Sequence, residues 1–184
     1  MNYRESIDLG LTCNLSAASG KFAKPGSKAS YAPDQDFDAQ HILLELGLDV
    51  PKKTVNGKCT TTFKAINEGA KEIRFDAVGM KILSVTSSSG ESLRHIYKKE
   101  KLTVTLRQPA AQEDIVTVVV AYRLVNPIAG VYFITPDKHY PKKPVQVWTH
   151  GEAEESRFWF PCFDAPHDKA STEMIATVPA DFFA

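Results

Sequence analysis

The sequence predicts an all-β protein, a two-sheet and mainly antiparallel β-sandwich. Many short segments alternate apolar and polar residues with a period of two, the pattern of a strand with one buried face. One continuous β-branched run, residues 115–122, predicts a central strand covered on both faces. No segment shows a convincing amphipathic helical pattern, and only residues 152–157 could form a short helical turn. Together these observations favour a two-sheet sandwich over a closed barrel.

The strand candidates begin after a change in composition at residue 39. Residues 1–38 are broken by Ser, Gly and Pro and predict a tail or irregular lead-in, whereas residues 39–184 predict the sandwich domain. The run around Lys98–Lys101 predicts a hairpin turn between two strands. The expected strands span residues 42–50, 55–65, 73–75, 80–85, 93–97, 102–106, 115–122, 131–134, 145–149 and 174–178.

Composition and charge exclude several classes of partner. The 184 residues contain 22 basic and 22 acidic side chains, so the net charge is zero, and we expect no nucleic-acid partner. The longest apolar run, residues 115–122, is far too short to cross a bilayer, so we expect no membrane span. Residues 1–11 contain charged side chains where a signal peptide would be apolar. The three cysteines are widely spaced and odd in number, which fits a reducing, cytoplasmic location.

The sequence shows no catalytic or metal-binding motif. None of the five histidines is followed by Glu, and no two are four residues apart, so the H-E-x-x-H pattern of a helical zinc site is missing. Nucleophile-elbow, phosphate-loop and dinucleotide-binding patterns are also missing. We therefore expect no metal, no cofactor and no catalytic residue within the 184 residues themselves.

The segment from Val145 to Pro166 is the most informative part of the sequence. Its aromatic residues lie among charged ones, which predicts apolar anchoring beside a charged surface at an interface or at the rim of a cleft. Arg157 and Asp164 are seven residues apart, and we expect them to form a partly buried structural pair that fixes the loop. Cys162 is expected to be a small buried side chain rather than a reactive thiol.

This segment resembles the T-Q-x-E…R…F-P-C-x-D-x-P motif of M1-family zinc metallo-aminopeptidases of the aminopeptidase N type. The match is ungapped over eighteen residues and consists of Thr149-His150-Gly151-Glu152, Arg157, Phe160-Pro161-Cys162-Phe163-Asp164 and Pro166. The resemblance extends over about residues 39–184. It implies a β-sandwich that sits on a thermolysin-like catalytic domain of the same parent chain and supplies one wall of its active site.

The resemblance also implies roles for two residues. Glu152 matches the glutamate of this domain that helps to bind the free α-amino group of a peptide substrate, and His150 stands where the motif usually has Gln, lining the space for the first side chain. A histidine is bulkier than glutamine and can become charged. The family's zinc and exopeptidase motifs lie beyond residue 184, so the catalytic domain is absent from this chain. The parent protein would use zinc to activate water and remove N-terminal residues from peptides.

A non-catalytic alternative fits part of the same segment. The second subunit of the TFIID transcription factor shares this architecture and a similar R-F-W-F-P-C run, here Arg157 to Cys162. That protein acts as a scaffold. Glu152 and the intact Asp164-Ala165-Pro166 ending favour the enzyme.

Overall fold

The computed structural model describes residues 33–183, which form ten β-strands and one short 3₁₀ helix. Residues 33–36 precede the first strand and have no regular structure. The elements are β1 (Phe37–Asp49), β2 (Thr54–Ala65), β3 (Ala70–Asp76), β4 (Lys81–Ser87), β5 (Arg94–Lys98), β6 (Lys101–Ala110), β7 (Ile115–Val125), β8 (Val131–Ile134), β9 (Gln146–Thr149), η1 (Ser156–Phe158) and β10 (Ser171–Thr177). The expected tail, residues 1–38, lies mostly outside the described residues.

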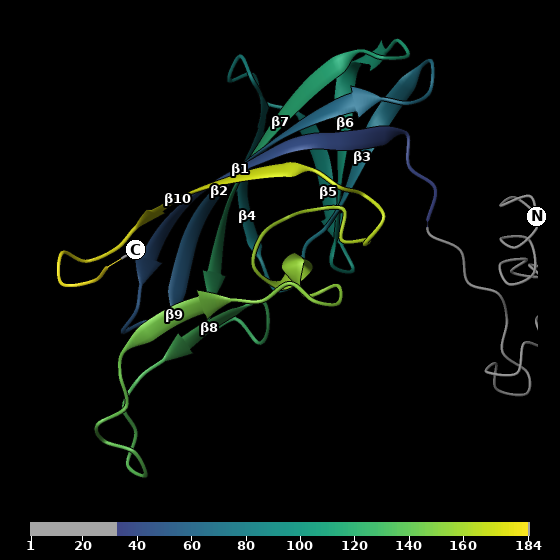
Figure 1. The fold of residues 1–184 in the computed structure, drawn as a ribbon. Helices are drawn as coiled ribbons and strands as arrows, with labels where there is room; N and C mark the ends of the chain where they lie inside the picture. The colour runs from purple at the N-terminus through teal and green to yellow at the C-terminus, as the bar shows by residue number, and fades with distance from the viewer. Residues whose placement is uncertain (1–32, 184) are drawn as a thin grey trace, which may run out of the picture. The chain divides into compact units, whose positions relative to one another are not determined.

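The strands form one large sheet and two smaller ones (Figure 1). The large sheet has the order β10-β1-β2-β7-β4, and a three-stranded sheet has the order β3-β6-β5. All pairs are antiparallel except β1 with the edge strand β10. The all-β, mainly antiparallel fold expected from the sequence is therefore confirmed. The sequence did not predict that β8 and β9 pair with each other as a separate third sheet.

Strand β1 begins at Phe37, two residues before the boundary expected from the sequence. Gln40 is an extra residue in the pairing of β1 with β2, where the register shifts between Ala39 and His41. Such a bulge changes which residues face the core. Phe37 and Ala39 are buried before it, and Leu44 and Leu46 after it. The change from odd to even positions hides the start of the strand from a search for strict alternation.

The expectation that β7 is covered on both faces is wrong. Val118, Val120, Tyr122 and Leu124 are buried, whereas Ile115 at the start of the strand is 64% exposed. The alternate residues of β7 are half-buried or exposed, so one face of the large sheet lacks a covering layer within residues 33–183. β-branched residues favour a strand on either face, and a run of them does not by itself show burial.

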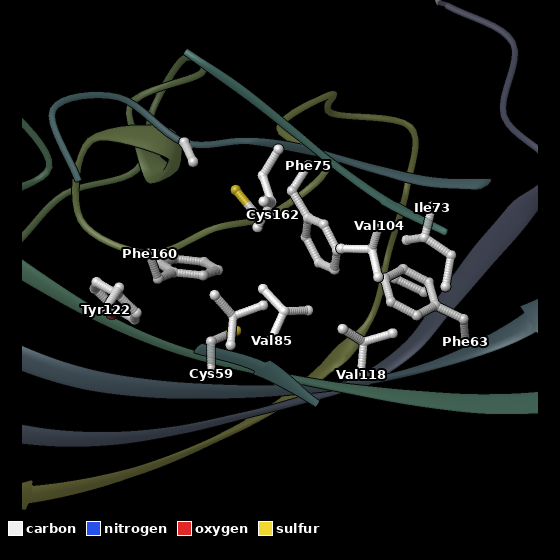
Figure 2. Packing of buried hydrophobic residues seen from close by; sticks show 14 of the residues in the cluster. Cys59, Phe63, Ile73, Phe75, Val85, Val104, Val118, Tyr122, Phe160 and Cys162 are labelled. Atoms are coloured by element: carbon white, nitrogen blue, oxygen red, sulfur yellow. The ribbon is translucent and has the colours of Figure 1, made fainter. Parts of the chain in front are cut away.

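The core lies between the large sheet and the three-stranded sheet. Phe63 of β2 packs edge-to-face against Phe75 of β3, with ring centroids 5.6 Å apart. Figure 2 shows Val85 and Val118 of the large sheet below Val104 of β6. Phe160 and Cys162 also enter this core, although they belong to the long connection between β9 and β10. The core therefore anchors the segment that the sequence singled out.

Candidate functional site

The candidate site is a loop, residues 150–166, that follows the small β8–β9 sheet. Tyr132 of β8 and Trp148 of β9 stack, with ring centroids 4.3 Å apart. One residue after β9, the backbone N–H of His150 donates to the carbonyl of Gly130 at 2.9 Å. Gly130 has φ +77°, and a Cβ there would lie 2.5 Å from the Glu155 carbonyl oxygen. A glycine is therefore required where the loop passes this close to the chain before β8.

Buried aromatic residues anchor the middle of the loop. Trp159, Phe160 and Cys162 are each less than a tenth exposed, whereas Trp148 is 46% exposed. Burial raises the pKa of the Cys162 thiol well above its ordinary value, so this side chain is a neutral, apolar anchor. The sequence predicted apolar anchoring beside a charged surface, and these buried side chains provide the apolar anchoring.

Arg157 and Asp164 lie together and close the loop. Arg157 Nε donates to Asp164 Oδ2 at 2.9 Å, and the Arg157 backbone N–H donates to the same oxygen at 3.0 Å. The side chains are 22% and 9% exposed. Partial burial acts to lower the pKa of Arg157, but the hydrogen bond to Asp164 and the nearby carboxylates outweigh it and raise that pKa. Arg157 Nη2 also donates to Glu154 at 2.9 Å.

Glu152 lies on the exposed part of this loop. Its side chain is 86% exposed, and the Nε2 atom of His150 lies 3.8 Å from the Glu152 carboxylate. His150 itself is 51% exposed. The loop thus presents the Glu152 carboxylate to solvent with the His150 imidazole beside it, and Glu154, which pairs with Arg157, is also exposed.

Glu152 opens onto a cleft of about 460 Å³. The apolar residues that line the cleft include Phe63, Phe75 and Phe160. Every charged residue that lines it is acidic, namely Glu152, Glu154, Asp164 and Asp168. Partial burial raises the pKa of Asp168, although the backbone N–H of Ala39 donates to it. A cleft lined by carboxylates and aromatic rings fits a ligand that is cationic at one point and apolar elsewhere.

His150 does not line this cleft. Its Nε2 atom lies 3.8 Å from the Glu152 carboxylate.

Sequence reasoning missed two contacts that position the loop. The hydroxyl of Tyr132 donates to Glu155 at 2.9 Å, and this hydrogen bond raises the pKa of Tyr132. Asp76, at the end of β3, is 7% exposed and accepts a hydrogen bond from the backbone N–H of Asp164. Both contacts join residues 23 or more positions apart, and only the pairing of strands could have revealed them.

Within residues 33–183, no three His, Cys, Asp or Glu side chains are grouped as metal ligands would be. Over the same range the structure has no helix with both the length and the apolar character needed to span a membrane.

Comparison with protein families places this fold and loop in a known group. The peptidase M1 N-terminal domain model matches residues 28–184. The chain belongs to this family. A solved structure of an M1 zinc metallopeptidase from Deinococcus radiodurans superposes with a TM-score of 0.66 at 25% identity, covering 79% of this chain and 33% of that one. The resemblance drawn from the loop motif is thereby confirmed.

The curated relatives are much longer than this chain. Aminopeptidase B of Mus musculus is 26% identical over 179 residues, which are 85% of this chain and 27% of that protein. Transcription initiation factor TFIID subunit 2 of Danio rerio is 29% identical over 86 residues, or 46% of this chain and 7% of that protein. The chain thus spans about a quarter of the aminopeptidase relative, and the broader match is to the peptidase.

Proposed function

We propose that this chain is the substrate-anchoring N-terminal domain of a zinc aminopeptidase that removes N-terminal residues from peptides. The proposal rests on the position of Glu152. Its carboxylate is exposed on the loop of residues 150–166 and lies at a cleft whose charged lining residues are all acidic. A peptide N-terminus carries an ammonium group, for which a carboxylate is the natural partner. The relatives are M1 zinc metallopeptidases and aminopeptidase B, which supports a peptidase as the parent.

In this proposal Glu152 recognises the substrate and takes no part in bond cleavage. The ammonium donates hydrogen bonds to Glu152 and to a second carboxylate from the catalytic domain of the same parent chain. A blocked N-terminus could not donate these bonds and would leave carboxylates unpaired, so the site would reject it. His150, beside Glu152, would contact the first side chain of the peptide and influence which residue is preferred.

The catalytic domain would also hold the zinc ion, since residues 33–183 do not provide its ligands. When bound there, zinc would supply the activated water for hydrolysis. We further propose a cytoplasmic location, which the free, buried thiols of Cys59 and Cys162 support. The zero net charge supports the absence of a nucleic-acid partner.

The scaffold alternative is not favoured. The TFIID subunit matches less than half of the chain, whereas mouse aminopeptidase B matches 85% of it. Aminopeptidase activity of the parent protein separates the two, because a scaffold would have none.

The test of the proposal is a Glu152→Ala variant of the full-length parent. Loss of one hydrogen bond between charged groups should lower kcat/KM for aminoacyl substrates by about 10- to 100-fold. Zinc content and thermal stability should stay at the parent's values, because the side chain is exposed. Glu173→Ala serves as the matched control, since Glu173 is an exposed carboxylate on β10 outside the loop. Parent-level activity of the Glu152 variant would refute the proposal.

A further inference from the structure

A buried carboxylate outside the sequence motif connects the loop to the three-stranded sheet. Asp76 is the last residue of β3, and its side chain is 9% exposed. One of its oxygens pairs with the Lys101 ammonium, whose own side chain is 61% exposed. The other oxygen accepts a hydrogen bond from the backbone N–H of Asp164 at 3.2 Å. Both carboxylate oxygens of Asp76 are therefore paired, one with Lys101 of β6 and the other with the loop at Asp164.

The backbone around Asp76 reinforces the connection. Asp76 and Cys162 form an isolated antiparallel bridge, with N···O distances of 2.6 and 3.1 Å. Two residues later, the backbone N–H of Val78 donates to the carbonyl of Arg157 at 2.8 Å. The pairing of Arg157 with Asp164 closes the loop, and both residues thus contact the chain at residues 76–78.

The cluster joins two cations to three carboxylates. Asp76 and Asp164 are the buried carboxylates, Lys101 and Arg157 are the cations, and Glu154 pairs with Arg157 at the exposed side. Partial burial acts to lower the pKa of Arg157, but the hydrogen bond to Asp164 raises it and the charge of Asp76 raises it further. Removing the Asp76 side chain would leave the pair Arg157–Asp164 and the backbone bridge to Cys162 in place, but the backbone N–H of Asp164 would lose its acceptor on β3.

Glu152 has no comparable support of its own. Among the described residues the His150 imidazole lies 3.8 Å from its carboxylate, and no hydrogen bond within the protein is formed by the Glu152 side chain. Its place is therefore set by the backbone of residues 150–157, in which the Glu155 N–H donates to the Gly151 carbonyl at 3.0 Å, and by the two ends of this stretch. The first end is the His150–Gly130 backbone hydrogen bond, and the second is Arg157, fixed through Asp164 and residues 76–78.

We infer that Asp76 is a positioning residue for Glu152, acting through Asp164 and Arg157 to fix the loop that presents the carboxylate to a substrate ammonium. This inference rests on the proposed function of Glu152. It adds a residue from β3, 76 positions before Glu152 in the sequence, to the substrate-anchoring site.

The first arm of the test uses the 184-residue chain and needs no activity. Amide hydrogen exchange is measured in Asp76→Asn, which keeps the shape and one acceptor oxygen, and in Asp76→Ala. The amides of Arg157 and Asp164 should exchange at least about tenfold faster in Asp76→Ala, and less so in Asp76→Asn, while amides of β2 and β7 keep their rates. Glu45→Ala, which removes an exposed pair with Lys58, is the control and should leave the loop amides unchanged. Unchanged protection of Arg157 and Asp164 in both Asp76 variants overturns the inference.

The second arm is a double-mutant cycle in the full-length parent. Asp76→Asn should raise KM for aminoacyl substrates about tenfold with little change in kcat, because it displaces a binding group and leaves the catalytic domain intact. In a Glu152→Ala background the same substitution should have less than about a twofold effect, because the group it positions is gone. An equal effect in both backgrounds shows a general structural role and overturns the inference. If Glu152→Ala alone keeps the parent's activity, the proposed function fails. Faster exchange in the Asp76 variants would then show only that Asp76 stabilises the loop, without a role in substrate binding.

Discussion

Asp164→Ala should destabilise the chain strongly, because it leaves the partly buried Arg157 guanidinium without its main partner. Asp164 accepts hydrogen bonds from Arg157 Nε and from the Arg157 backbone N–H, and its own side chain is 9% exposed. Breaking a buried ion pair by removing one member costs about 3–5 kcal/mol. Arg157 is 22% exposed and keeps Glu154 as a second partner, so we expect the lower end, about 3 kcal/mol.

Urea unfolding of the 184-residue chain measures this loss. With an m value of about 2 kcal/mol per molar, a loss of about 3 kcal/mol lowers the midpoint by about 1.5 M. Glu45→Ala is the control, because its pair with Lys58 is 37% and 49% exposed and should contribute less than about 1 kcal/mol. A midpoint for Asp164→Ala that matches the parent's would show that the pair does not fix the loop.

Two further predictions concern the core. Gly57→Ala should cost about 1–3 kcal/mol, because a Cβ at this position would lie 2.2 Å from the Tyr122 ring; thermal unfolding should show this loss, and Gly47→Ala, where the nearest atom is 3.8 Å away, should be close to neutral. Burial raises the pKa of the Cys59 thiol from 9.0 to about 12, so the thiol of the unfolded chain ionises first as the pH rises and stability falls between these values. Cys59→Ala should remove this part of the decline in urea titrations above about pH 9, and an unchanged pH slope would contradict the assignment.

The strands were predictable because most of them follow a simple period. The hairpin turn expected at Lys98–Lys101 is confirmed, with Lys99 and Glu100 at positive φ between β5 and β6. The start of β1 was not predictable, since the bulge at Gln40 changes which positions face the core. Nor could composition show that one face of β7 is partly open.

The site was predictable only where its residues are close in sequence. Arg157 and Asp164 are seven positions apart and lie within one recognisable motif, and the structure places them 2.9 Å apart. Asp76 contacts Asp164 across 88 positions. In the sequence it directly follows the alternating residues Ile73 and Phe75 of a predicted strand. Strand periodicity therefore gave no sign that Asp76 is part of a buried ion pair or of the site. Long-range contacts of this kind depend on the topology of the sheets.

The most direct test of the account is whether Glu152 recognises a free ammonium group. The measurement is the inhibition constant of a dipeptide and of its analogue lacking the α-amino group, for the full-length parent and for Glu152→Gln. The account predicts that the parent binds the amine-bearing dipeptide at least about tenfold more tightly, as expected for a charge-assisted hydrogen bond, and that Glu152→Gln loses most of this preference. An equal preference in the parent and in the variant would contradict the account.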